Sequence, residues 1–325
     1  MDIFELPKIE LHCHLDGSLP ISFIKEELGD EGIQKEQVQV QANCSSLAEY
    51  LQKFKLPLAS LKTEKSFERA GYSVLAEVRK ENVKYIELRF APMLSVSETL
   101  SCRQAIEGLV AGLKRGEREF EIKANVIVCM MRHLSLEENL EAIRNAREML
   151  GEGVCAVDLA GDEAAFANGE FKELFEQVRK WDMPFTIHAG ECGSAFSVKE
   201  ALELGAKRIG HGIALRKDWE LVKEVAKKNI GIEMCPTSNL QTKAIDNWQE
   251  YPLIDFVKAG LKVSVNTDNR TVSNTTMTKE LELVYQSSNQ DEELIRQVLQ
   301  NALETSFASE EVKHDIGKKM GRILK

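Results

Sequence analysis

Two histidines, His12 and His14, stand one residue apart near the start of the chain, at the end of a short run of strand-forming residues. Because alternate residues of a strand point to the same face, we expect both imidazoles to project together, with Cys13 turned away. Two neutral imidazoles on one strand end make half of a metal site. An isolated pair of this kind is more often a packing or surface feature, so its meaning depends on the rest of the chain.

Histidines recur where later strand-like runs end. Five of the six histidines follow such a run, and only His314 does not. Structural histidines would be scattered, so this placement favours a shared site. The five are His12, His14, His133, His188 and His211, of which His133 has the best case for a purely structural role.

Short β-rich runs alternate with amphipathic segments along the chain. We predict eight strands: Ile9–Leu15, Tyr85–Ala91, Ile122–Met131, Cys155–Leu159, Phe185–His188, Arg208–Gly210, Gly231–Met234 and Lys262–Asn266. Eight strands alternating with helices predict an α/β fold, a closed (β/α)8 barrel of the TIM type, whose chemistry sits at the carboxyl ends of the strands. A doubly wound open sheet is the alternative, because the run at 208–210 is weak.

Two segments do not fit the simple alternation of one strand with one helix. Residues 20–80 are predicted to form several helices inserted after the first strand, and residues 288–325 to form closing helices at the C-terminal end. We find no linker or low-complexity stretch, so we expect residues 1–325 to form one domain.

The first insertion carries one apolar stripe with helical spacing, at positions i, i+3, i+4 and i+7. Core packing is the common explanation of such a stripe. The insertion emerges at the predicted active-site face, however, which favours an apolar wall or lid over a substrate. The stripe consists of Leu47, Tyr50, Leu51 and Phe54.

Three imidazoles and one carboxylate are a donor set that suits Zn²⁺. The first and eighth strands are neighbours in a closed barrel, and the fifth reaches across from the other side. No lysine ends the fourth strand, where two-metal barrel hydrolases often use a modified lysine, so we predict one Zn²⁺ per chain. A bound water would have its pKa lowered from about 15.7 toward about 7. The predicted ligands are His12, His14, His188 and Asp268.

Glu191 follows His188 by three residues, at the point where the chain leaves the fifth strand. A carboxyl group in a closed apolar pocket tends to stay protonated and can act as a general acid. The alternative is a solvated loop carboxylate. His211, one strand further on, can orient or deprotonate the metal-bound water.

Six segments together resemble the adenosine deaminase family of metal-dependent hydrolases. Their order and spacing match over essentially the whole chain. The resemblance implies a (β/α)8 barrel with one zinc ion that hydrolyses the 6-amino group of adenosine and 2′-deoxyadenosine, releasing ammonia. The segments are Pro7–Ser18, Asp158–Glu163, His188–Glu191, Gly210–Gly212, Cys235–Asn239 and Asn266–Asp268.

The resemblance also implies roles for individual residues. Glu191 would protonate purine N1, while His211 and Asp268 would hold and deprotonate the water. The backbone N–H of Gly161 would donate to purine N3, and Asp16 would meet the ribose hydroxyls. The implied substrate-binding set is His14, Asp16, Gly161, Asn269 and the lid residues Leu47, Tyr50, Leu51 and Phe54.

One position departs from the family pattern. Many members carry a second Asp and then Pro after the metal-binding Asp, whereas this chain reads Asp268-Asn269-Arg270. The second Asp is thought to donate to purine N7 in its protonated form, and an Asn amide donates at any pH. Adenine or another 6-aminopurine therefore stays open as a substrate. An inactive purine-binding protein is the second alternative, although every ligand and catalytic position holds a competent residue.

Arg132 and Arg270 are the only candidates for binding a phosphate, and we expect each to serve in a salt bridge or at the surface instead.

The amino-acid composition limits the classes of molecule that the protein is expected to bind. Lys plus Arg number 42 against 52 Asp plus Glu, a net charge of −10 without a basic cluster, which argues against nucleic acid or an anionic membrane. The N-terminal residues lack the pattern of a signal peptide, and no apolar run approaches the roughly 18 residues of a spanning helix. Seven scattered cysteines suit reduced thiols. We therefore expect a cytoplasmic enzyme with a small-molecule substrate and make no prediction of its oligomeric state.

Overall fold

The computed structural model describes residues 1–41, 44, 47–192 and 194–323, except the side chains of residues 47–48 and 322–323. Within those residues the chain forms eight strands, each within two residues of its predicted bounds at either end. They are β1 (Lys8–His14), β2 (Val83–Phe90), β3 (Lys123–Met131), β4 (Val154–Ala160), β5 (Thr186–Ala189), β6 (Arg208–His211), β7 (Gly231–Met234) and β8 (Lys262–Val265).

The strands form a closed parallel barrel. β1 to β4 pair in order, and so do β5 to β8. Backbone hydrogen bonds join the two halves: Val157 N–H donates to Pro184 O at 3.1 Å, and Asp268 N–H donates to His12 O at 2.9 Å. The second of these junctions lies at the predicted metal ligands. The (β/α)8 prediction is confirmed, and the open doubly wound alternative is wrong.

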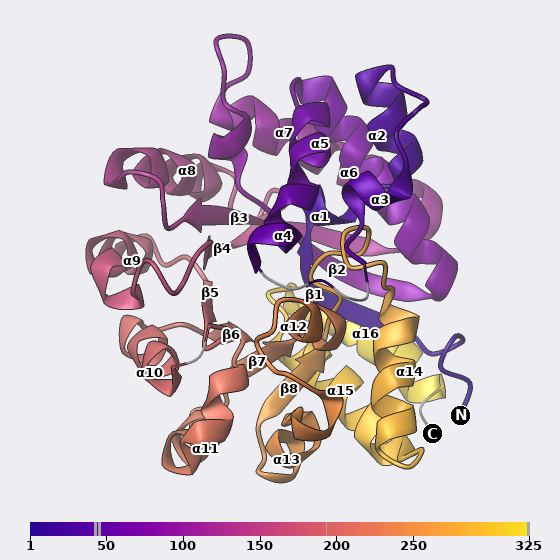
Figure 1. The fold of residues 1–325 in the computed structure, drawn as a ribbon, viewed down its shortest axis with the longest axis vertical. Coiled ribbons are helices and arrows are strands. Elements are labelled where there is room, and N and C mark those ends of the chain that lie inside the picture. The colour runs from indigo at the N-terminus through magenta and orange to yellow at the C-terminus, as the bar shows by residue number, and fades with distance from the viewer. Residues whose placement is uncertain (42–43, 45–46, 193, 324–325) are drawn as a thin grey trace.

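Helices surround the strands, as Figure 1 shows. Helices after β2 to β7 cover the outside of the barrel, and α15 packs against β8 and β1. None of the helices in the described part of the chain combines the length and apolar character needed to cross a bilayer. The covering helices are α7 (Cys102–Phe120), α8 (Leu136–Glu148), α9 (Lys172–Lys180), α10 (Ala195–Leu204), α11 (Trp219–Lys227), α13 (Leu253–Lys258), α14 (Met277–Ser287) and α15 (Glu292–Thr305). The short helix α12 (Pro236–Gln241) lies inside this ring, and α16 (Glu310–Ile323) packs against α15.

The long connection between β1 and β2 consists of several helices, as predicted. The apolar stripe does not lie on one helix, because α4 gives way to a 3-10 turn after Leu51. The inserted helices are α1 (Leu15–Ser18), α2 (Ile21–Leu28), α3 (Lys35–Val38), α4 (Leu47–Leu51), α5 (Lys55–Ser60) and α6 (Glu64–Val78). Short 3-10 turns are η1 (Gln52–Phe54), η2 (Arg79–Glu81), η3 (Pro92–Ser95), η4 (Asn168–Phe171), η5 (Ile213–Lys217) and η6 (Trp248–Glu250).

Glycines allow α6 and α7 to pack closely. A Cβ atom on Gly112 would lie 2.0 Å from the carbonyl oxygen of Glu68, and one on Gly108 would lie 2.3 Å from that of Glu64. Any larger residue at either position would force the two helices apart. Side-chain caps fix where such helices begin: the hydroxyl of Ser101 accepts a hydrogen bond from the Gln104 N–H at the start of α7.

The interior of the barrel is charged in its middle layers. Branched aliphatic residues usually fill this space in barrels of this type. Here a network of fully buried ion pairs joins charged side chains of the strands, although they stand in runs that read as apolar in the sequence. Its members are Glu87, Arg89, Asp158, Arg208 and Glu233.

Candidate active site

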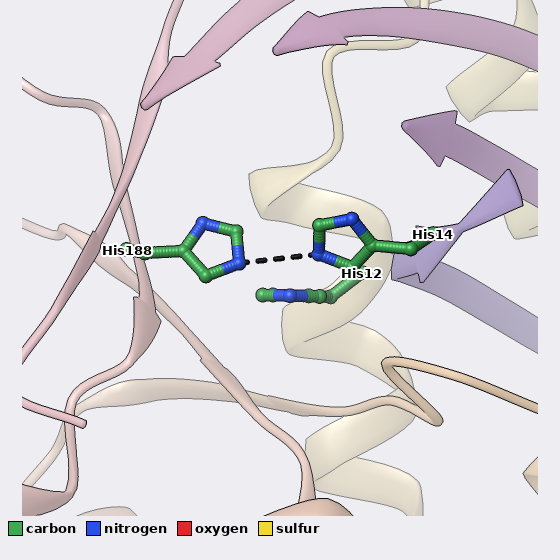
Figure 2. Close-up of side chains that lie close together, drawn as sticks. All are labelled: His12, His14 and His188. Carbon is green, nitrogen blue, oxygen red and sulfur yellow. Dashed lines mark hydrogen bonds between the residues drawn. The ribbon is translucent and has the colours of Figure 1, made fainter. Parts of the chain in front are cut away.

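Four histidines meet at the carboxyl end of the barrel. The ring centroid of His12 lies 5.3 Å from that of His14, 4.6 Å from that of His188 and 4.8 Å from that of His211. Figure 2 shows His12 and His14 of β1 facing His188 of β5. The sulfur of Cys13 lies 3.2 Å from the Ser18 hydroxyl instead.

The two other histidines take no part in this cluster. His133 and His314 are both exposed. Of the five histidines that were predicted to follow strands, four therefore lie in the cluster and one, His133, lies at the surface.

The predicted metal ligands have the spacing of a tetrahedral site. Nε2 of His14 and Nε2 of His188 are 3.2 Å apart, and Oδ1 of Asp268 lies 3.4 Å from Nε2 of both His12 and His14. Ligands about 2.0–2.1 Å from a zinc ion in tetrahedral geometry are about 3.3 Å from one another. Nε2 of His12 is also a buried nitrogen without a hydrogen-bond partner. Both observations fit a metal ion held between the four groups.

Carboxylates behind the rings determine which ring nitrogen faces the cluster. Nδ1 of His12 lies 2.8 Å from Oε2 of Glu233, and Nδ1 of His188 lies 3.0 Å from Oδ2 of Asp158. A carboxylate accepts a hydrogen bond from Nδ1–H, which leaves the lone pair of Nε2 free for a metal.

Burial and neighbouring charges shift the pKa values of the site in different directions. Burial lowers the pKa of His12 and His14, which favours the neutral imidazoles that a metal requires. Burial opposes the charged form of His188 as well, but Asp158 outweighs it and raises the pKa of His188. Burial would likewise raise the pKa of Asp268, but its histidine neighbours outweigh burial and hold that pKa well below its usual range.

Two site residues have unusual backbone conformations. His211 and Asp268 have φ angles of 65° and 61°, in the left-handed region that residues other than glycine seldom adopt. Such strain persists only where the surroundings enforce it, and it concentrates at functional sites.

One short helix contacts three of the predicted functional groups. From α12, the hydroxyl of Ser238 donates to Asp268, and the amide of Asn239 lies 3.0 Å from Nδ1 of His211. The hydroxyl of Thr242, directly after the helix, donates to Oε1 of Glu191 at 3.2 Å. The start of this helix belongs to the predicted family segment Cys235–Asn239, but Thr242 was not predicted as a site residue. The run of polar residues after β7 is the sequence feature that could have indicated its role.

Glu191 faces the cluster rather than solvent. Its side chain is 17% exposed, and Oε2 lies 3.6 Å from Nε2 of His211. The carboxylate of Glu163 holds the loop in place, because it accepts hydrogen bonds from the backbone N–H groups of Gly190, Glu191 and Cys192 at 2.6, 3.0 and 3.0 Å. The role of Glu163 was also missed, since loop geometry is needed to see it.

A pocket of about 280 Å³ opens over these groups, near the lower end of the roughly 300–1,000 Å³ of small-molecule sites. Seven of the predicted substrate-binding residues line it: His14, Asp16, Tyr50, Leu51, Phe54, Gly161 and Asn269. The side chain of Leu47 lies outside the described residues. Among the described lining residues there is no Lys or Arg, and further apolar wall comes from Leu58, Ala91, Leu94 and Met131.

Gly17 makes room for Asn269. A Cβ atom at position 17 would lie 1.8 Å from Oδ1 of Asn269, so only glycine is compatible with this packing. Burial raises the pKa of Asp16, one residue earlier, to about 6.

The two arginines considered for a phosphate have other partners. Arg270 is buried in ion pairs with Glu10 and Glu81, as predicted. Arg132 is not at the surface and forms no salt bridge with any described residue, contrary to prediction. It is 2% exposed and donates to the backbone oxygens of Phe166 and His188, because a buried guanidinium must find acceptors.

Comparisons with known proteins agree with this architecture. The family model described as adenosine deaminase matches residues 7–322. The chain is 39% identical over 326 residues to an adenosine deaminase of Clostridium perfringens, covering 97% of this chain and 98% of that protein. It is 42% identical over 323 residues to an adenosine deaminase of Clostridium botulinum, covering 96% of each.

The solved structures include a close structural match. An N6-mAMP deaminase of Arabidopsis superposes with a TM-score of 0.88 at 28% identity, covering 98% of this chain and 99% of that chain. The fold and the order of the strands are therefore shared over the whole length of the barrel.

Proposed function

Because the chain belongs to the adenosine deaminase family of enzymes, hydrolases of C–N bonds in cyclic amidines, we propose that it uses one Zn²⁺ to deaminate adenosine and 2′-deoxyadenosine. The products would be inosine, 2′-deoxyinosine and ammonia. The observation that carries the proposal is the convergence of three imidazoles and Asp268 beside Glu191 at the floor of one pocket.

The metal would be held by His12, His14, His188 and Asp268. Their spacing and the unpartnered Nε2 of His12 support this assignment. A zinc ion bound there supplies a water that ionises near neutral pH. One ion per chain is favoured, since the two donor groups found among the described residues share His12.

The remaining groups would move protons. Glu191 would give a proton to purine N1, which makes C6 more electrophilic, and water would then add to C6. His211 and Asp268 would orient this water, take one of its protons and pass that proton to the amino group, which would leave C6 as ammonia. The remaining hydroxyl proton would return to Glu191, which leaves a carbonyl at C6 and the proton on N1. Fixed groups that face the developing charge stabilise such an addition.

The pocket fits an uncharged nucleoside better than a nucleotide. Its described lining contains the carboxylates of Asp16, Asp162, Glu191 and Asp268 but no Lys or Arg that would pair with a phosphate. The Arabidopsis relative is named for a nucleotide derivative, so adenosine monophosphate is an informative competitor. Asp16 is the proposed ribose contact, which would favour adenosine over adenine.

We further propose that residues 1–325 act as one catalytic domain, because its first and last strands both lead into the proposed ligands. Six cysteines (Cys13, Cys102, Cys129, Cys155, Cys192 and Cys235) are free thiols, which supports the proposed cytoplasmic location.

The test is to mix the zinc-loaded protein with adenosine and follow the ultraviolet change that accompanies loss of the 6-amino group, together with ammonia release. We expect turnover that a chelator abolishes and zinc restores, with adenosine preferred over adenine and adenosine monophosphate. Glu191→Gln should retain the metal and lose activity by about 10²-fold or more. Full activity in that variant would remove Glu191 from its role.

The same assay distinguishes the two alternative functions. Turnover of adenine but not adenosine would make Asn269 and the lid residues signs of a different 6-aminopurine. Binding of a purine nucleoside without ammonia release would support an inactive binding protein.

A further inference from the structure

Arg89 of β2 sits at the centre of the charged interior of the barrel. Its Nη1 donates to Oδ2 of Asp158 at 2.9 Å, and its Nη2 donates to Oε2 of Glu233 at 2.8 Å. All three side chains are 0% exposed. A buried guanidinium between two buried carboxylates is a fixed arrangement, because the planar fork matches its acceptors in only one geometry.

The two acceptor carboxylates also contact proposed metal ligands. Nδ1 of His188 is hydrogen-bonded to Oδ1 of Asp158 at 3.2 Å and lies 3.0 Å from its Oδ2, and Nδ1 of His12 lies 2.8 Å from Oε2 of Glu233. The guanidinium therefore contacts the same carboxylates that orient two imidazole rings. Those rings come from β1 and β5, on different four-stranded halves of the barrel.

A third contact ties the same group to the backbone beside His12. Nη2 of Arg89 also donates to the carbonyl oxygen of Leu11, the residue that precedes His12 in β1. The guanidinium thus fixes both the strand position of His12 and the carboxylate that turns its ring.

Loss of Arg89 would leave two buried carboxylates without the cation that they share. Asp158 would keep its contact with His188, and Glu233 would keep its contacts with His12 and Arg208. Burial of uncompensated negative charge is costly, so the removal should disturb the ring positions that these carboxylates hold.

We propose that Arg89 is a positioning residue that aligns His12 and His188 for metal binding through Glu233 and Asp158. Removal of an outer-shell partner typically weakens a metal site about 10–100-fold, and Arg89 supports two ligands at once. The inference rests on the metal site of the proposed function and is independent of its substrate.

The test compares two equivalent substitutions, Arg89→Lys and Arg208→Lys. Both arginines are buried and both contact Glu233, but Arg208 contacts the other oxygen, Oε1, and reaches Glu87 rather than Asp158. Each substitution keeps the charge and removes the planar fork. The zinc dissociation constant is measured by chelator competition, and the visible spectrum of the Co²⁺-loaded protein reports the ligand geometry, both without substrate.

We expect Arg89→Lys to weaken zinc binding about 10–100-fold and to change the Co²⁺ spectrum. Arg208→Lys should weaken it less than about tenfold and leave the spectrum close to that of the wild type. Arg89→Met, which also removes the charge, should weaken binding further. If Arg89→Met does not fold, the pair of lysine variants carries the comparison.

Wild-type zinc affinity and spectrum in Arg89→Lys would overturn the inference. Equal losses in Arg89→Lys and Arg208→Lys would also overturn it, because the effect would then come from the charged core in general. If the wild-type protein binds zinc but deaminates no purine, the proposed function fails while this comparison still decides the role of Arg89.

Discussion

The hydroxyl of Ser238 donates to Oδ2 of Asp268 at 2.5 Å, which leaves Oδ1 of the same carboxylate facing His12 and His14. The serine thus determines which oxygen is available to a metal. Outer-shell hydrogen bonds of this kind typically contribute a factor of about 10 or more to metal affinity.

We predict that Ser238→Ala weakens zinc binding about tenfold, measured by chelator competition. Ser306→Ala is the matched control, because Ser306 is also buried but donates to Leu303 O at the end of α15. The control should bind zinc like the wild type. Equal affinities in all three proteins would show that Asp268 needs no help from Ser238.

The contact between Thr242 and Glu191 predicts a different kind of effect. Thr242→Val removes the donor to Oε1 of Glu191 without touching a proposed metal ligand. Since leaving a buried hydrogen-bonding group without its partner costs about 1–3 kcal/mol, we expect kcat for adenosine to fall about tenfold or more with unchanged zinc affinity.

Thr305→Val provides the control for that change. Thr305 is a partly buried threonine at the opposite end of the barrel, where its hydroxyl donates to Asn301 O. Its kcat should stay within about twofold of the wild type. A wild-type kcat in Thr242→Val would mean that Glu191 is positioned by Glu163 and its loop alone.

The clustering of the proposed metal ligands was predictable from the sequence, because strand periodicity and barrel topology determine where such residues lie. His12 and His14 are separated by one residue on a strand, and His188 and Asp268 follow strands that a closed barrel brings to the same end. The apolar strand runs were long enough to predict each strand to within two residues.

The supporting residues were not predictable in the same way. Arg89 and Glu233 are 144 positions apart, and their pairing depends on which interior layer each occupies. Charged residues inside otherwise apolar strands are the sequence signal for such a charged interior. The contacts of Glu163 depend on loop conformation, which periodicity does not determine.

Asp16 predicts a discrimination between substrates. It lines the pocket from the first turn of α1, two residues after β1 ends, where a ribose would meet it under the proposed function. Asp16→Ala should raise KM for adenosine about tenfold or more, because a buried partner is lost, and should change KM for adenine little. Steady-state kinetics with both substrates measure the difference.

Asp162→Ala is the control for pocket charge. Asp162 lines the same pocket but accepts hydrogen bonds from the backbone of Ala164 and Ala165. Its removal should affect adenosine and adenine alike. Parallel changes for both substrates in Asp16→Ala would rule out a ribose contact.

Glu280 predicts a dependence of stability on pH. It is fully buried and accepts hydrogen bonds from the Thr237 N–H, at the start of α12, and from Thr275. Burial raises its pKa from 4.5 to about 7. Between these values the folded protein keeps a proton that the unfolded chain releases, so the unfolding free energy falls as pH rises from about 4.5 to about 7, by up to about 3 kcal/mol.

Glu280→Gln imitates the protonated form and should remove this fall. Denaturant unfolding of the zinc-saturated proteins between pH 5 and pH 8 should show the variant gaining stability over the wild type as pH rises through about 7. Glu310→Gln is the control, since Glu310 is a 92% exposed residue of α16 and should follow the wild-type curve. Identical pH slopes for the wild type and Glu280→Gln would show that Glu280 is ionised in the folded protein throughout this range.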